Sequence, residues 1–176
     1  MNTLIRKHIR ERILILDGAM GTMIQRHGLQ ESDYRGSRFI DHPVAVKGNN
    51  ELLLLTKPEI ISSIHDAYLE AGADIIETCS FGANAISQSE YRLQAYIDEM
   101  NRAAVRCARE SCEKFTKIDQ KPRFVAASIG PTSHSLAIAS SADDPSFREI
   151  DFDSLKKAYD EQMFALLDEG VDIVLI

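Results

Sequence analysis

The stretch Tyr-Leu-Glu-Ala-Gly-Ala-Asp-Ile-Ile at positions 68–76 decides the fold class, because it joins the end of a helix to the start of a strand. A similar stretch, Leu-Leu-Asp-Glu-Gly-Val-Asp-Ile-Val, recurs at positions 166–174. In both, a glycine follows the helical part and an apolar run follows an aspartate. Equivalent joints of this kind are expected from repeated βα units on a parallel sheet.

The sequence contains four apolar runs with strand character, two of which belong to these joints. They lie at residues 13–16, 74–77, 123–127 and 172–176. Segments with helical periodicity separate them, so the prediction is an α/β fold with about four parallel strands and intervening helices.

Three long helices are predicted between these runs. The first covers residues 56–71, where Thr56 and Glu59 have the spacing of a capping box. The second extends from about residue 98 to residue 115, and the third follows Asp153.

The pattern alone leaves two α/β architectures open. A closed parallel barrel takes eight strands and typically about 250 residues, whereas an open doubly wound sheet can use this number of strands. The last run reaches Ile176, where such folds place their next functional loop. The sequence therefore predicts a chain that is cut within its fold.

The composition is that of an ordinary globular domain, with 44% hydrophobic and 27% charged residues among 176. The net charge is -7 and no basic run occurs, which argues against nucleic acid or an anionic membrane as a partner.

No apolar stretch approaches the ~18 residues of a membrane span, and the N-terminus lacks a secretory signal pattern. Three cysteines form neither an even disulfide set nor a CxxC motif, so we predict a cytoplasmic protein with a small-molecule ligand.

Polar residues follow each of the first three runs, at the strand ends where parallel α/β folds bind their ligands. Asp17 and Glu77 can pair with the ammonium of an amino acid, or instead cap a helix or form an internal salt bridge. Gly18 and Gly21 allow a close backbone approach or simply a tight turn, and without a lysine they are not a phosphate loop. The candidate ligand-binding residues are Asp17, Gly18, Ala19, Glu77, Thr78, Cys79, Ser128, Gly130 and Thr132.

No catalytic residue or metal ligand is predicted. Cys79 has no base near it in sequence, so a packed or ligand-lining thiol is favoured over a nucleophile. Cys107 and Cys112 are five positions apart on a predicted helix and point to different faces. The histidines show no ligand spacing, and His134, the one nearest the predicted site, fits a solvated loop.

Several motifs, in this order, resemble cobalamin-dependent methionine synthases, and together they extend over essentially the whole chain. The Asp-Tyr-Arg-Gly and Lys-Gly-Asn-Asn motifs favour this family over the betaine-dependent homocysteine methyltransferases, which share the first motif and the barrel. The motifs are Ile-Leu-Asp-Gly-Ala-Met-Gly-Thr-Met-Ile-Gln (15–25), Asp-Tyr-Arg-Gly (33–36), Lys-Gly-Asn-Asn-Glu-Leu-Leu (47–53), Thr-Lys-Pro-Glu-Ile-Ile (56–61), Ala-Gly-Ala-Asp-Ile-Ile-Glu-Thr (71–78) and Gly-Pro-Thr (130–132).

The resemblance implies that residues 1–176 form the amino-terminal half of a homocysteine-binding (β/α)8 barrel of the TIM type. In this family zinc activates the thiol of homocysteine, which takes a methyl group from methylcobalamin to give methionine; 5-methyltetrahydrofolate regenerates the methylcobalamin. Carried over by position, Asp17 with the turn at 18–22, Glu77 and Thr78 with the residues after them, and residues 130–132 resemble the homocysteine lining. Cys79 stands where the family usually has an asparagine.

The resemblance also implies what this chain lacks. The zinc cysteines of the family lie in the second half of the barrel, so no zinc or cobalamin is expected to bind this chain alone, and it is expected to be inactive alone. Its expected partners are homocysteine, the remaining barrel half and the folate and cobalamin domains, in cis or in trans. The alternatives are a non-catalytic split subunit, a self-associating half-barrel, a fragment of a betaine-type enzyme, and an independent open-sheet binding protein.

Overall fold

The computed structural model describes residues 3–134, 136 and 149–176. Three strands form one parallel sheet in the order β1-β2-β3, namely β1 (Ile75–Glu77), β2 (Phe124–Ser128) and β3 (Ile173–Leu175). In the register of the sheet, Ile76 lies opposite Val125, and Ala127 lies opposite Val174. Strands that are neighbours in the sheet are therefore also neighbours along the chain.

The first predicted strand is only partly formed. Leu16 makes a single parallel bridge with Ile75, and no regular strand is present at residues 13–16. The backbone N–H groups of Asp74 and Ile75 nevertheless donate to the carbonyl of Ile15, and that of Asp17 donates to the carbonyl of Ile75. The expectation of four strands is thus corrected to three strands and a bridged edge segment, which has no strand on its outer side in the described part of the chain.

The strand order resolves the choice between the two architectures. A doubly wound sheet reverses its order at a switch point, whereas the order here runs from the bridged segment through β1 and β2 to β3 without reversal. Progression in one direction, with a helix in each connection, is the arrangement of a (β/α)8 barrel. The fold is therefore part of a TIM-type barrel, as predicted.

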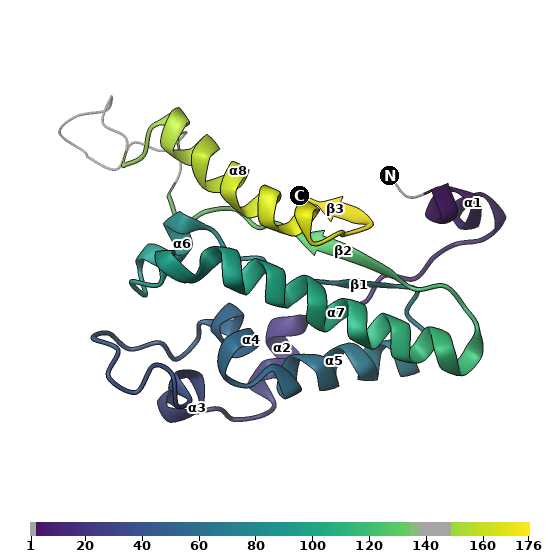
Figure 1. Cartoon of the computed structure of the whole chain (residues 1–176), viewed down its shortest axis with the longest axis horizontal. Coiled ribbons are helices and arrows are strands. Elements are labelled where there is room, and N and C mark those ends of the chain that lie inside the picture. The colour runs from purple at the N-terminus through teal and green to yellow at the C-terminus, as the bar shows by residue number, and fades with distance from the viewer. Residues whose placement is uncertain (1–2, 135, 137–148) are drawn as a thin grey trace.

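The three predicted long helices are present as α5, α7 and α8, and they lie side by side in Figure 1. The capping box at Thr56 and Glu59 is wrong. Thr56 ends a short helix, where its hydroxyl donates to the carbonyl of Leu52 at 3.3 Å, and no side chain caps α5. The helices are α1 (Thr3–Glu11), α2 (Met20–Gln25), α3 (Glu31–Arg35), α4 (Leu53–Thr56), α5 (Pro58–Glu70), α6 (Ala85–Ser89), α7 (Ile97–Asp119) and α8 (Phe152–Asp168), with two 3-10 turns, η1 (Asn50–Leu52) and η2 (Gln94–Tyr96).

Helix α7 is the central helix of the core, because it packs against α5, α8 and the sheet. Met100 and Ala104 join a cluster with α4 and α5, whereas Ala108 packs with Leu69 and Val125 beneath the sheet. Burying such apolar side chains contributes about 25 cal/mol per Å² of surface removed from water. Cys107 and Cys112 are free and buried on this helix.

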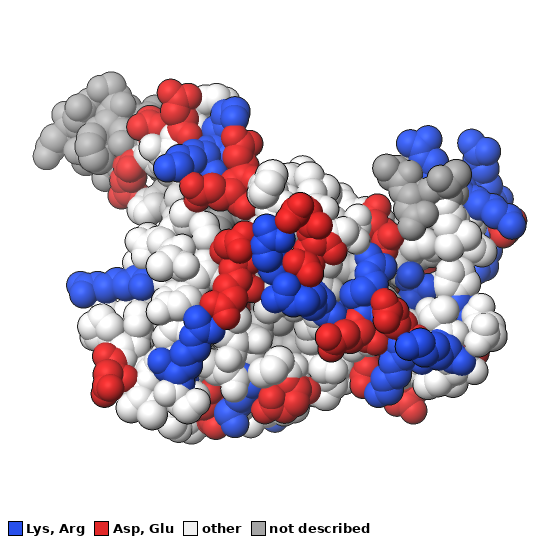
Figure 2. Space-filling view, in the orientation of Figure 1, with Lys and Arg blue, Asp and Glu red and all other residues white. Residues whose placement is uncertain are grey.

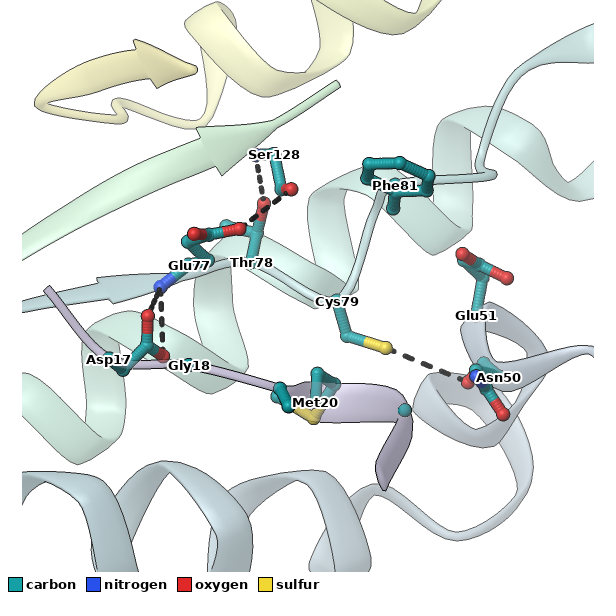
Figure 3. A pocket seen from close by; sticks show the side chains of 12 residues that line it. Asp17, Gly18, Met20, Asn50, Glu51, Glu77, Thr78, Cys79, Phe81 and Ser128 are labelled. Atoms are coloured by element: carbon teal, nitrogen blue, oxygen red, sulfur yellow. Dashed lines mark hydrogen bonds between the residues drawn. The ribbon is translucent and has the colours of Figure 1, made fainter. Parts of the chain in front are cut away.

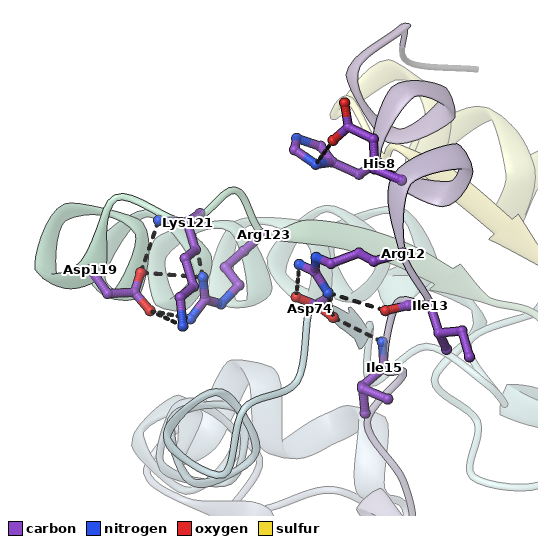
Figure 4. A network of polar contacts seen from close by, with 9 residues as sticks. His8, Arg12, Ile13, Ile15, Asp74, Asp119, Lys121 and Arg123 are labelled. Atoms are coloured by element: carbon purple, nitrogen blue, oxygen red, sulfur yellow. Dashed lines mark hydrogen bonds and ion pairs between the residues drawn. The ribbon is translucent and has the colours of Figure 1, made fainter.

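The helix-to-strand joint that occurs at residues 68–76 and again at 166–174 has one structural role in both copies. The carboxylate of Asp74 accepts the backbone N–H of Ile15 at 2.9 Å and two hydrogen bonds from Arg12, at 2.6 and 2.7 Å (Figure 4). The carboxylate of Asp172 accepts the N–H of Val125 at 2.9 Å and pairs with Arg109 at 2.8 Å. Each aspartate thereby attaches its own strand to the strand before it, so the repeat reflects repeated βα units.

We expect Asp74→Ala to destabilise the fold by about 2 kcal/mol, because it leaves a backbone N–H and a guanidinium without their acceptor. The Arg12 pair holds the pKa of Asp74 below its ordinary value. The stabilisation is therefore present above the unfolded pKa and is lost as the pH falls through the folded pKa. Urea unfolding at neutral and acidic pH measures both effects.

The control for this substitution is Asp160→Ala, which removes an exposed ion pair with Lys156 and is expected to change stability by less than about 1 kcal/mol. Equal losses of stability in the two variants would refute the role of Asp74.

Charged side chains of both signs are interspersed on the face shown in Figure 2. Several of them form ion pairs between neighbouring helices, such as Arg102 with Asp168 at 2.7 Å and Lys114 with Asp66 at 2.6 Å. Exposed pairs of this kind contribute roughly 0–1 kcal/mol each. Within residues 3–134, 136 and 149–176, no helix is long and apolar enough to cross a membrane.

Candidate functional site

A cavity of about 350 Å³ opens at the carboxyl ends of the bridged segment, β1 and β2 (Figure 3). We call it the main cavity. Its walls come from the turn that leads into α2, from η1, and from the residues at the ends of the two strands. This is the edge at which barrels of this type bind their ligands.

Most of the predicted ligand-binding residues line this cavity. They are Asp17, Gly18, Ala19, Glu77, Thr78, Cys79 and Ser128.

The structure does not bring Gly130 and Thr132 into the main cavity. Gly130 lies against the Phe81 ring, and Thr132 lines a neighbouring hollow of about 320 Å³, where its hydroxyl donates to the carbonyl of His134 at 2.7 Å. We call this second space the outer hollow.

The main cavity also contains residues outside the list of candidate ligand-binding residues. Met20 and Gly21 belong to the turn at 18–22 and Phe81 follows Thr78, so the resemblance included their regions, whereas Asn50 and Glu51 were not assigned to the site. Asn50 and Glu51 belong to the Lys-Gly-Asn-Asn-Glu motif, which was noted for its resemblance alone. They lie far from any strand end in sequence and reach the cavity because Asn49 fixes η1: its side-chain oxygen accepts the N–H of Leu52 at 3.2 Å, and its amide donates to Gln88 at 2.7 Å.

A chain of hydrogen bonds connects the acids at one end of the cavity. The two carboxylate oxygens of Asp17 lie 3.0 and 3.1 Å from the backbone N–H of Glu77. The hydroxyl of Ser128 donates to the Glu77 carboxylate at 2.9 Å. Burial raises the pKa of Asp17 to about 7, with a further contribution from the negative charge of Glu77. Asp17 therefore exchanges its proton near neutral pH.

Thr78 joins the two strands rather than facing a ligand with its hydroxyl. Its oxygen accepts the N–H of Ser128 at 3.1 Å and lies 2.6 Å from the hydroxyl of Ser80. Ser80 in turn donates to the carbonyl of Ser128 at 2.8 Å. Both hydroxyls are buried and already hydrogen-bonded, so this end of the cavity is rigid.

Cys79 places its sulfur on the cavity wall, 3.8 Å from the carbonyl oxygen of Asn50. Burial and the neighbouring Glu51 raise the pKa of this thiol well above its ordinary value. A thiol that stays protonated is a poor nucleophile. The geometry agrees with a lining role for Cys79.

Glu51 and Phe81 form the wall between the main cavity and the outer hollow, because they line both. One oxygen of Glu51 accepts the N–H of Gly82 at 2.7 Å. The Phe81 side chain is 56% exposed, and its ring lies where a side chain on Gly130 would stand, 2.4 Å from the ideal Cβ position. Gly130 therefore acts indirectly, by leaving room for the Phe81 ring.

We expect Gly130→Ala to displace the Phe81 ring and to destabilise the fold by about 1–3 kcal/mol, as overpacking does. Ring-proton contacts measured by NMR report the displacement, and urea unfolding reports the stability. The double variant Gly130→Ala/Phe81→Ala is expected to regain most of the loss. If the loss persists without the ring, the contact with Phe81 is not its cause.

The side chains of the main cavity are poorly suited to hold a metal ion. Within the described ranges, no group of three or more His, Cys, Asp or Glu side chains stands close enough to hold a metal ion. At the main cavity, Asp17 and Glu77 are held by other protein groups, and the thiol of Cys79 stays protonated. The described residues thus do not fit the zinc that the resemblance implies.

Comparison with known proteins identifies the family. The model of the family described as homocysteine S-methyltransferase matches residues 14–176. This chain belongs to the homocysteine S-methyltransferase family. The homocysteine S-methyltransferase match begins just before Asp17 and includes every residue of the main cavity.

Solved structures of the homocysteine methyltransferase MmuM from Escherichia coli share the fold of this homocysteine S-methyltransferase domain. The oxidized form is 24% identical, with a TM-score of 0.72, and the match covers 98% of this chain and 56% of that one. The metallated form is 23% identical, with the same TM-score, and the match covers 97% and 55% of the two chains. The chain thus spans about half the length of these relatives.

Proposed function

We propose that this chain is the amino-terminal, homocysteine-binding half of the barrel of a cobalamin-dependent methionine synthase. In the complete enzyme, a methyl group would pass from methylcobalamin to zinc-activated homocysteine, giving methionine. The observation that carries the proposal is the main cavity, in which Asp17 and Glu77 stand together at the strand ends of a homocysteine S-methyltransferase domain. The chain itself would bind and orient homocysteine.

The chemistry of the cavity suits a thiol amino acid. An ammonium group placed between Asp17 and Glu77 gains charge-assisted hydrogen bonds, which are the stronger kind in a partly dry pocket. Met20 and Cys79 line the wall between this end and Asn50 in Figure 3, and their sulfur atoms suit the side chain of homocysteine. The volume of the cavity is that of a small-molecule site.

The methionine synthase motifs act together in support of the finer proposal. Arg35, in Asp-Tyr-Arg-Gly, donates to the carbonyls of Phe39, Ile40, His42 and Val44 and so shapes the loop that leads to Lys-Gly-Asn-Asn. Tyr34 donates to the side chain of Asn50 at 3.5 Å. One motif therefore positions the other at the cavity. The support for the methionine synthase type over the betaine type comes from the presence of both motifs in the sequence.

Titration calorimetry of the chain with L-homocysteine tests the proposal. We expect binding with one site, and no binding of 4-mercaptobutanoate, which keeps the thiol and the carboxylate but lacks the ammonium. A folded chain that gives no heat with L-homocysteine, or that binds both compounds equally, contradicts it. We also expect no methyl transfer from methylcobalamin by this chain alone, because its described residues offer no zinc ligand set.

The edges of the sheet support the proposed need for the remaining barrel half. Ile13 and Ile15, on the bridged segment, are 85% and 54% exposed, and Ile176, after β3, is 98% exposed. Apolar edges of an open parallel sheet favour pairing with further strands. We propose that the rest of the barrel covers them, in cis or in trans. Light scattering distinguishes this from the self-associating half-barrel, which would be a concentration-dependent dimer.

A further inference from the structure

The segment between β1 and α6 has no regular secondary structure, yet distant parts of the chain hold its backbone. Its four successive carbonyl groups, from Ser80 to Ala83, accept hydrogen bonds from four different places in the fold. The donors, at 2.6 to 3.0 Å, are the side-chain amides of Gln162 on α8, Gln88 on α6 and Asn101 on α7, and the backbone N–H of Gly130. The three amide side chains are buried. The course of this segment is therefore set by the elements around it.

Gln162 makes the longest of these connections along the chain, over 82 positions. Its side chain is fully buried, and its Nε2 donates to the carbonyl of Ser80 at 2.6 Å. Ser80 stands between Cys79 and Phe81, which both line the main cavity (Figure 3). Helix α8 itself contributes none of the described residues that line this cavity. Gln162 thus reaches the cavity wall from an element outside it.

Helix α8 also holds the residue on the other side of the Phe81 ring. Tyr159 precedes Gln162 by three positions, so the two side chains leave the helix on the same face. The hydroxyl of Tyr159 donates to the carbonyl of Gly130 at 3.2 Å, and the N–H of Gly130 donates to the carbonyl of Phe81 at 3.0 Å. Since the Phe81 ring lies against Gly130, α8 fixes both the residue before the ring and the residue beside it.

The residue type at position 162 suits positioning better than stabilisation. The side-chain oxygen of Gln162 has no hydrogen-bond partner in the described part of the chain, and a buried polar atom without a partner destabilises a fold. The carbonyl of Ser80 also accepts the N–H of Ala83 at 3.0 Å, so it keeps one partner without Gln162. That second bond is local to the turn and does not hold the segment against α8. The particular contribution of the Gln162 amide is therefore the location of Ser80.

We propose that Gln162 is a positioning residue of the main cavity, whose amide holds Ser80 against α8 and thereby sets where Cys79 and Phe81 stand. The proposal rests on the proposed function where it concerns affinity, because it takes homocysteine as the ligand. It makes the site depend on the third βα unit, which lies outside the cavity.

Gln162→Met tests the proposal, because methionine keeps the length of the side chain and removes the donor. We expect the affinity for L-homocysteine, measured by calorimetry, to fall about tenfold, the equivalent of one hydrogen bond. In the free chain, we expect the NMR contacts between the Phe81 ring protons and the α protons of Gly130 to weaken. The midpoint of urea unfolding is expected to change little, since the substitution also removes the unpaired oxygen.

The matched control is Leu69→Ala, which is expected to give the opposite pattern. Leu69 is 2% exposed and packs with Ala108 and Val125, outside the main cavity. Its truncation lowers the urea midpoint, as loss of a buried side chain does. Under conditions in which this variant is folded, its affinity for homocysteine and its Phe81 ring contacts are expected to equal those of the unaltered chain.

Gln162→Glu provides a second variant, because an acid in this place donates to Ser80 only while it is protonated. Burial raises the pKa of the introduced acid, so its proton is retained to a higher pH than on an exposed glutamate. At the lowest pH at which the chain is folded, we expect the Phe81 ring contacts of this variant to equal those of the unaltered chain. Weak contacts at that pH contradict the role of the donor.

Unchanged affinity and ring contacts in Gln162→Met overturn the inference and leave the proposed function standing. A large loss of stability in Gln162→Met, or an equal loss of affinity in Leu69→Ala, also overturns it, because the amide would then act through the stability of the fold. Absence of homocysteine binding by the unaltered chain is instead a failure of the proposed function. The ring contacts of the free chains then decide by themselves whether Gln162 positions Phe81.

Discussion

Asp17→Asn is expected to weaken the binding of L-homocysteine by about tenfold to hundredfold above pH 7, where the carboxylate is ionised. A hydrogen bond between charged groups contributes about 1.5–3 kcal/mol, and asparagine retains the shape but not the charge. Calorimetry at constant ionic strength measures the loss. Asp41→Asn, at an exposed position outside the cavity, is the control and should bind as the unaltered chain does.

The same variant is expected to change how stability depends on pH. The pKa of Asp17 is raised to about 7 in the folded chain, against an ordinary value of 3.8, so the folded state holds this proton more tightly than the unfolded state. The resulting stabilisation is present in full below the unfolded pKa and is lost as the pH rises through about 7. Urea unfolding of Asp17→Asn should lack this decline between about pH 4 and pH 7. A decline of equal size in the variant would mean that another group causes it.

Phe124→Ala is expected to have the largest effect on stability, a loss of about 3–5 kcal/mol. Phe124 begins β2, is 2% exposed, and lies opposite Ile75 in the sheet. Its ring is also 6.3 Å from that of His8 on α1, so its removal leaves a cavity where the sheet meets the first helix. Urea unfolding measures the loss.

The matched control for this substitution is Phe152→Ala. Phe152 begins α8, and its side chain is 66% exposed, so little buried apolar surface is lost there. We expect a change within about 0.5 kcal/mol. A loss at Phe124 no greater than that at Phe152 would show that β2 is not packed as described.

The fold was predictable because its signals are local. The joint at residues 68–76 and its copy at 166–174 carry a helix end, a glycine and an aspartate in fixed order, and the structure places Asp74 and Asp172 in equivalent bonds to the preceding strand. The choice of a barrel over a doubly wound sheet was not local. It depended on the order of the strands, which the sequence pattern left open.

The candidate site was predictable where residues lie at the carboxyl end of an apolar run, as Asp17 does after the bridged segment and Glu77 does at the end of β1. Glu51 was not, because it reaches the cavity through a loop whose course is set by Arg35 and Asn49. Gly130 was selected as a ligand-binding residue but does not line the main cavity, and the sequence does not show that the Phe81 ring needs the space beside it. The assignment of the cavity residues to homocysteine binding remains a prediction.

The most direct test of the central claim, that the main cavity binds homocysteine, is an amide NMR titration of the chain with L-homocysteine. We expect saturable shifts confined to the segments that line the cavity, namely the turn at 17–21, η1, residues 77–82 and the end of β2. Shifts that do not saturate, or that cluster at the amino-terminal end of the sheet around Arg12 and Asp74, would contradict it.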